Sequence, residues 1–166
     1  MRSIERFTPE VIIQPWGTET LVAEVPGATM KVLEYEAGKG GGLQYHMKKT
    51  EAFYLLSGLA RVRYDYGDGI LTQVILRPGD AACVIPAGTP HQFLAIEDCV
   101  VIEISTPGTN DRVNVAERYG LAVEPGTLPT TYDAETIADF EAWQIATARL
   151  QLDFDMSGDG DIVVIP

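Results

Sequence analysis

Short runs of apolar residues alternate with turn residues from Val11 to about Ile104. The runs are rich in Val, Ile, Leu, Tyr and Phe, and Gly and Pro separate them at intervals that suit strands better than helices. We therefore expect strands at 20–25, 30–36, 43–46, 51–56, 59–66, 70–76, 82–85, 91–96 and 99–104. So many short strands, with no helical period between them, predict an all-β antiparallel sandwich or barrel with its core at about residues 20–105.

The pattern changes after Ser105. Residues 106–132 contain Gly and Pro, and we expect them to form a strap that wraps the barrel. Asp133 can cap a helix at about 133–150, because apolar residues then recur at three- and four-residue steps on one face: Ile137, Phe140, Trp143, Ala146 and Leu150. That face should be buried on the barrel or on a partner subunit.

Residues 151–166 are expected to form a C-terminal tail. The segment 155–162 resembles the start of an EF-hand calcium loop, but the twelfth position of that loop, which needs a bidentate Glu, falls on Pro166. We therefore expect an acidic turn that leads into a final strand at 162–165.

Composition narrows the class of protein. A chain of 166 residues with 46% hydrophobic content is the size of one domain, so we expect a single domain over 1–166. Its 12 Lys and Arg against 24 Asp and Glu give a net charge of −12, which disfavours nucleic acid and anionic membranes as partners. The sequence shows no signal peptide and no membrane-spanning segment, which indicates a cytoplasmic protein. Cys83 and Cys99 are interpreted as reduced, buried thiols.

The two histidines of the chain, His46 and His91, each lie inside a strand signature framed by Gly or Pro. The first signature contains Gly38, Gln44, His46, Glu51 and Gly58, and the second contains Pro86, Gly88 and His91. Two residues apart on a strand, Gln44 and His46 point to the same face and can meet one ion. Two imidazoles, one carboxylate and one amide oxygen form a mixed nitrogen and oxygen shell for a divalent metal.

These signatures resemble the two cupin motifs over about residues 30–105, which implies a double-stranded β-helix, or jelly-roll, barrel. Gln44 replaces the first histidine of the family motif, Ala95 replaces an Asn, and the gap from Gly79 to Pro86 is six residues where five are usual. The resemblance implies one divalent metal ion on Gln44, His46, Glu51 and His91. We expect zinc, with manganese, nickel, cobalt and iron as alternatives.

The first signature is similar to that of the mannose-6-phosphate isomerase type, which carries Gln-x-His at this place. Pro15-Trp16-Gly17 and the segment 117–120 are also similar to segments of sugar-metabolism cupins. Lys49 stands where an Arg is usual and Phe53 where a Trp is usual, so the substrate stays open.

The site residues carry alternatives. Gln44 either binds the metal or hydrogen-bonds a water on it. Glu51 and Lys49 are the catalytic candidates, and Lys49 is either a solvated turn charge or a contact to a substrate anion. Tyr54, Phe93 and Tyr35 either pack in the barrel or stack on a ligand.

Three functions follow from the resemblance. The first is a metal-dependent isomerase or epimerase that acts on a sugar or sugar phosphate through an enediolate. The second is a non-haem oxygenase, because two histidines and a carboxylate also suit iron. The third is a non-catalytic sugar-binding or regulatory protein. By analogy with small cupins we expect a homodimer.

Overall fold

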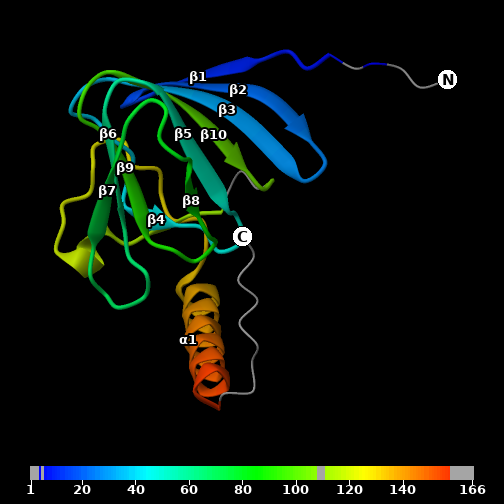
Figure 1. Ribbon diagram of the computed structural model, residues 1–166, viewed down its shortest axis with the longest axis vertical. Helices are drawn as coiled ribbons and strands as arrows, with labels where there is room; N and C mark the ends of the chain where they lie inside the picture. The colour runs from blue at the N-terminus through cyan, green and yellow to red at the C-terminus, as the bar shows by residue number, and fades with distance from the viewer. Residues whose placement is uncertain (1–3, 5, 108–110, 158–166) are drawn as a thin grey trace. The chain divides into compact units, whose positions relative to one another are not determined.

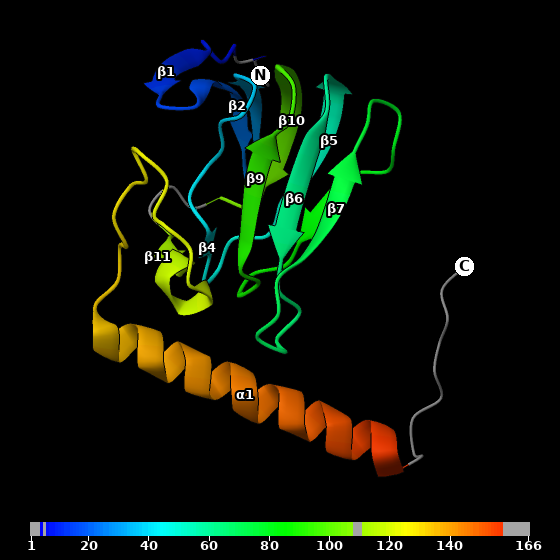
Figure 2. The same cartoon turned by 90° about the vertical axis from the view of Figure 1, so that its left-hand side faces the viewer.

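Two antiparallel sheets face each other in the computed structural model, which describes residues 4, 6–107 and 111–157 (Figure 1, Figure 2). The first sheet has the strand order β1-β2-β3-β10-β5-β8, formed by Glu10–Gln14, Gly17–Val25, Ala28–Tyr35, Cys99–Ser105, Glu51–Ser57 and Cys83–Ile85. The second has the order β11-β4-β9-β6-β7, formed by Val113–Asn114, Gln44–Tyr45, His91–Ala95, Ala60–Tyr64 and Thr72–Leu76. The predicted all-β jelly roll is confirmed.

The core lies between the two sheets, because successive strand residues point to opposite faces. On β10, Val101 is fully buried while Ile104 is 51% exposed on the outer face. The buried cluster takes side chains from both sheets: Leu33, Tyr35, Phe53, Leu55, Ala60, Val62, Leu76, Ile85, Phe93, Ala95, Cys99 and Val101. Cys99 thus packs in the core, where burial and the nearby Asp98 raise the pKa of its thiol to about 11, and Cys83 is half-buried.

The strap first contacts the barrel at Thr106, whose N–H donates to the Thr50 carbonyl at 3.0 Å, and it joins the second sheet further along. β11 pairs with β4, so that Val113 lies opposite Tyr45. A short 3₁₀ helix, Ala116–Tyr119, follows and ends at Gly120 in the left-handed conformation. The Thr131 N–H then donates to the Arg112 carbonyl at 2.9 Å, which closes the strap on itself.

The chain divides into two compact units, 1–131 and 132–166. The second contains α1, Ala134–Ser157, which begins at the predicted Asp133: its carboxylate accepts a hydrogen bond from the Thr136 N–H at 2.8 Å. The helix runs past the expected end at Leu150. Within it the rings of Phe140 and Trp143 lie 5.9 Å apart, and Trp143 is 61% exposed.

The sequence predicted that the apolar face of α1 is buried on the barrel or on a partner subunit, and this stays a prediction. The expected strand at 162–165 lies outside the described residues. Within those residues, no helix is both long and apolar enough to span a membrane.

Candidate metal centre

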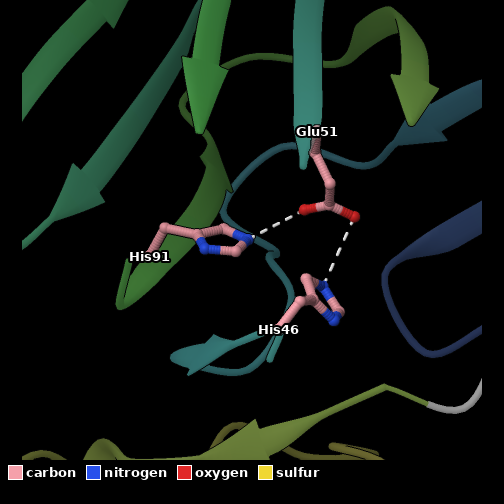
Figure 3. A group of neighbouring side chains, drawn as sticks. All are labelled: His46, Glu51 and His91. Carbon is pink, nitrogen blue, oxygen red and sulfur yellow. Dashed lines mark hydrogen bonds and ion pairs between the residues drawn. The ribbon is translucent and has the colours of Figure 1, made fainter. Parts of the chain in front are cut away.

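Three side chains meet where the ends of both sheets come together. His46 directly follows β4, Glu51 is the first residue of β5, and His91 is the first residue of β9. One ligand atom from each lies within 4.8 Å of the others, and each side chain is about 4% exposed. Figure 3 shows both imidazoles turned toward the Glu51 carboxylate. The sequence prediction named these three residues, and the structure brings them together.

Each histidine is oriented through its Nδ1 atom. His91 Nδ1 lies 2.8 Å from the Thr89 carbonyl oxygen, and His46 Nδ1 makes a short hydrogen bond to the Asp111 carbonyl oxygen. A neutral imidazole carries one N–H, so these carbonyls place that N–H on Nδ1 and leave Nε2 as an acceptor. Both Nε2 atoms therefore present lone pairs to the centre of the cluster.

The Nε2 atoms face another acceptor, the Glu51 carboxylate. His91 Nε2 lies 2.9 Å from Oε2, and His46 Nε2 lies 3.4 Å from Oε1. The lone pairs of the Nε2 atoms and of the carboxylate oxygens repel one another at these distances. A cation must therefore lie between them, and it is either a proton or a metal ion. The residues thus fit a divalent ion, which would take the lone pairs of both imidazoles and the charge of Glu51.

The Glu51 carboxyl is held ionised. Burial raises its pKa. When the cation between Glu51 and the Nε2 atoms is a proton, hydrogen bonds from His46 and His91, together with the positive charge of Lys49, bring the pKa of Glu51 well below its usual range. An ionised, buried carboxylate is the form that binds a metal ion.

Gln44 also reaches the cluster. Its side-chain Nε2 lies 3.3 Å from His46 Nε2, on the same face of the chain as predicted. Rotating the amide by 180° exchanges its nitrogen and oxygen, which would present Oε1 to the ion. Gln44 is therefore the fourth candidate ligand.

A cavity of about 120 Å³ opens beside the cluster. Lys49, Tyr35 and Phe93, three of the predicted substrate contacts, line it. Lys49 is only 9% exposed, and its ammonium group forms an ion pair with Glu51. The alternative of a solvated turn charge is therefore wrong.

The structure does not bring Tyr54 to the cavity. Tyr54 is 40% exposed on the outer face of β5, while its neighbour Phe53 faces inward and lines the cavity. The alternation of strand side chains is the reason, because Glu51 fixes the odd positions of β5 inside.

Glu103 was missed by the sequence analysis. It lies on β10 opposite Lys31 on one side and Phe53 on the other, and it is 6% exposed at the cavity wall. Burial, reinforced by the negative charge of Glu51, raises the pKa of Glu103 despite the two lysines nearby. Its inward position among the alternating residues of β10 was the only signal.

Asp111 was also missed. Its carboxylate accepts hydrogen bonds from the backbone N–H groups of Met47, Lys48 and Lys49 at 2.7–2.9 Å. The residue that positions His46 through its carbonyl therefore also fixes the segment between His46 and Glu51. No motif spacing indicates it, since the contact spans more than 60 residues of sequence.

Comparison with known proteins agrees with this architecture. Residues 31–105 match the family model described as "Cupin domain". Among curated proteins no sequence is significantly similar to the chain.

Several solved structures share the fold. KdgF from Halomonas sp. is 24% identical over 62% of this chain and 90% of its own, with a TM-score of 0.53. The capsular polysaccharide assembling protein CapF from Staphylococcus aureus is 19% identical over 66% of this chain, with a TM-score of 0.57, and oxalate decarboxylase from Bacillus subtilis is 19% identical over 74%, with a TM-score of 0.58. The match spans only 32% of that CapF chain and 38% of that oxalate decarboxylase chain.

Proposed function

We propose that the chain is a metal-dependent isomerase or epimerase that acts on a carbohydrate through an enediolate. One observation carries the proposal: a metal-ligand cluster and a separate carboxyl group with a raised pKa share one buried cavity. Isomerisation requires both a site that stabilises negative charge and a group that moves a proton. The sequence named metal ligands for the first role and Glu51 and Lys49 as catalytic candidates, but it did not single out the base.

The ligands would be His46, His91, Glu51 and Gln44, with zinc first among the expected ions. A bound divalent ion supplies Lewis acidity, which stabilises negative charge on neighbouring substrate oxygens. Glu51 is then occupied as a ligand and is a poor candidate for the base.

Glu103 is the better candidate for the acid and base. Its carboxyl group lies outside the ligand set, faces the cavity, and has a pKa shifted toward neutrality by burial. In this role the Glu103 carboxylate would take a proton from one substrate carbon and return it to the neighbouring carbon. Lys49 and Lys31 each lie 3.8 Å from Glu103 Oε1 and can stabilise the ionised carboxylate before and after this transfer. Lys49, between Glu51 and Glu103, would position both carboxylates.

Elemental analysis of protein purified without chelator or nickel affinity resin tests the metal site. We expect about one equivalent of a divalent metal in the wild type and its loss in His46→Ala, His91→Ala and Glu51→Gln. Glu97→Gln changes an exposed carboxylate on the same barrel and should keep the metal. No metal in the wild type, with all variants folded, would leave a non-catalytic binding protein.

The metal found directs the next assay. Zinc, manganese, nickel or cobalt leads to a screen of aldose and ketose isomerisation, in which Glu103→Gln should keep the metal and lose turnover. Iron leads to oxygen-consumption assays, because two histidines and one carboxylate also form a facial iron site. Oxygen uptake without sugar turnover would replace the isomerase by the oxygenase alternative.

A further inference from the structure

The cavity beside the metal centre contains an equal number of acidic and basic side chains. The acidic ones are Glu19, Glu51 and Glu103, and the basic ones are Lys31, Lys49 and Arg112. Buried charges are costly unless they are paired, so the pairing of these six shows which of them is available to a ligand.

Both lysines are paired with carboxylates. Lys31 Nζ lies 2.8 Å from Glu19 and 3.8 Å from Glu103, and Lys49 bridges Glu51 and Glu103. Three carboxylates thus face two ammonium groups, which leaves one negative charge. A metal ion bound to Glu51 would be partly balanced by this charge.

Arg112 is the cation without such a partner. It is half-buried and lines the cavity, yet its guanidinium forms no ion pair with a carboxylate in the ranges that the structure describes. Burial lowers its pKa, although the negative charges of Glu19 and Glu51 favour the charged form. A guanidinium stays protonated in proteins, so the cavity holds a permanent positive charge at this point.

The backbone of Arg112 is fixed. Its N–H donates to Thr131 Oγ1 at 3.0 Å, and its carbonyl accepts the Thr131 N–H at 2.9 Å. The next residue, Val113, is 2% exposed and pairs with Tyr45 on β4. The backbone of Arg112 is therefore anchored beside the cavity that its side chain lines, as the backbone of a binding residue should be.

The total charge then points to the ligand. The three acidic and three basic side chains cancel when all are ionised, and a divalent ion would add two positive charges. We infer that Arg112 binds an anionic group of the substrate, a carboxylate or a phosphate. The substrate of the proposed isomerase is then an acidic sugar and not a neutral one. That the bound anion belongs to the substrate rests on the proposed function. That Arg112 binds an anion does not depend on it.

Arg112 suits such a group chemically. Guanidinium presents parallel N–H donors that match the two oxygens of a carboxylate or phosphate. The stacked rings of Trp16 and Tyr35, with centroids 4.0 Å apart, form an aromatic wall of the same cavity on which a sugar ring can lie.

Titration calorimetry with matched sugars tests the inference on the metal-loaded protein. The probes are D-glucuronate and D-glucose 6-phosphate, each compared with D-glucose, which lacks the anionic group. We expect at least one charged probe to bind the wild type tenfold or more tightly than glucose, and the preferred probe tells a carboxylate from a phosphate. Arg112→Gln should abolish this preference, Arg112→Lys should keep part of it, and Arg77→Gln, which alters an exposed arginine, should keep all of it.

Two results would overturn the inference: equal affinity of the wild type for charged and neutral probes, or an undiminished preference in Arg112→Gln. The wild-type comparison stands even if the glutamine variant does not fold, and the metal content of each variant checks that the site is intact. A different result would contradict the proposed isomerase function alone. In that case the protein would still prefer charged sugars through Arg112 but would not convert any sugar.

Discussion

Replacing Asp111 by Ala removes a carboxylate that fixes the segment between His46 and Glu51 in the candidate metal centre. The side chain is 5% exposed and accepts three backbone N–H groups, from Met47, Lys48 and Lys49. A hydrogen bond to a charged group contributes about 1.5–3 kcal/mol, so three at the lower limit give about 4.5 kcal/mol. Water that enters the vacated space recovers part of this, and we expect a loss of about 3–4 kcal/mol in the free energy of unfolding.

The metal affinity should fall as well. The carbonyl of residue 111 still faces His46 Nδ1 in the variant, but the segment between His46 and Glu51 loses the anchor that sets its distance from that carbonyl. Loss of groups that orient metal ligands typically costs about 10–100-fold in affinity. We therefore expect Asp111→Ala to bind zinc about 10–100-fold more weakly than the wild type.

Urea denaturation of the metal-free protein and competition with a zinc chelator measure the two effects separately. Asp80→Ala is the matched control, because Asp80 accepts one backbone N–H, from Arg77 at 2.8 Å, in an exposed turn. Because water replaces the lost carboxylate in this exposed turn, the control should lose less than about 1 kcal/mol and bind zinc normally. If Asp111→Ala behaves like Asp80→Ala in both assays, the assignment of Asp111 as the positioning residue is refuted.

Three further predictions concern packing, pH and assembly. Gly40→Ala should cost about 1–3 kcal/mol in urea denaturation, since its Cβ would lie 2.5 Å from the Phe93 carbonyl oxygen, whereas Gly41→Ala meets open space and should be nearly neutral. Burial and the charge of Glu51 raise the pKa of Glu103, so its contribution to stability is full below its unfolded pKa of about 4.3 and is lost as the pH rises through the folded pKa. The stability of the metal-free wild type relative to Glu103→Gln should therefore decline from about pH 4 upward, and a constant difference would contradict the raised pKa. The expected homodimer predicts twice the chain mass in light scattering, and a monomer at micromolar concentration would rule it out.

The barrel and the three candidate metal ligands could be predicted from the sequence because both depend on local patterns. Alternation along each strand defines the inner face, and the motif spacing places Glu51 and His91 at the first residues of β5 and β9. The same alternation also argues against Tyr54 as a cavity residue, since Glu51 on the inner face requires Phe53 and not Tyr54 beside it. That rule was available from the sequence alone.

Other features depend on contacts that local patterns do not encode. β1 carries Ile12 and Ile13 in succession, which gives no alternation, and both side chains are substantially exposed on this edge strand. β11 is two residues long and exists through its pairing with β4. Alternation along β10 places Glu103 on the inner face, but its role as a cavity residue depends on its cross-strand neighbours Lys31 and Phe53, which the local sequence does not indicate.

The two histidines differ in how far their supports lie along the chain. His91 is oriented by Thr89, two residues away in its own motif, so its position follows from the local fold. His46 is oriented by Asp111 from the strap, whose next residue, Arg112, faces the cavity. The ligand geometry at His46 and the charge of the proposed anion site thus depend on two adjacent residues, Asp111 and Arg112, which directly precede the pairing of β11 with β4. A change in the pairing of β11 with β4 should therefore disturb metal binding and anion binding together, while leaving His91 in place.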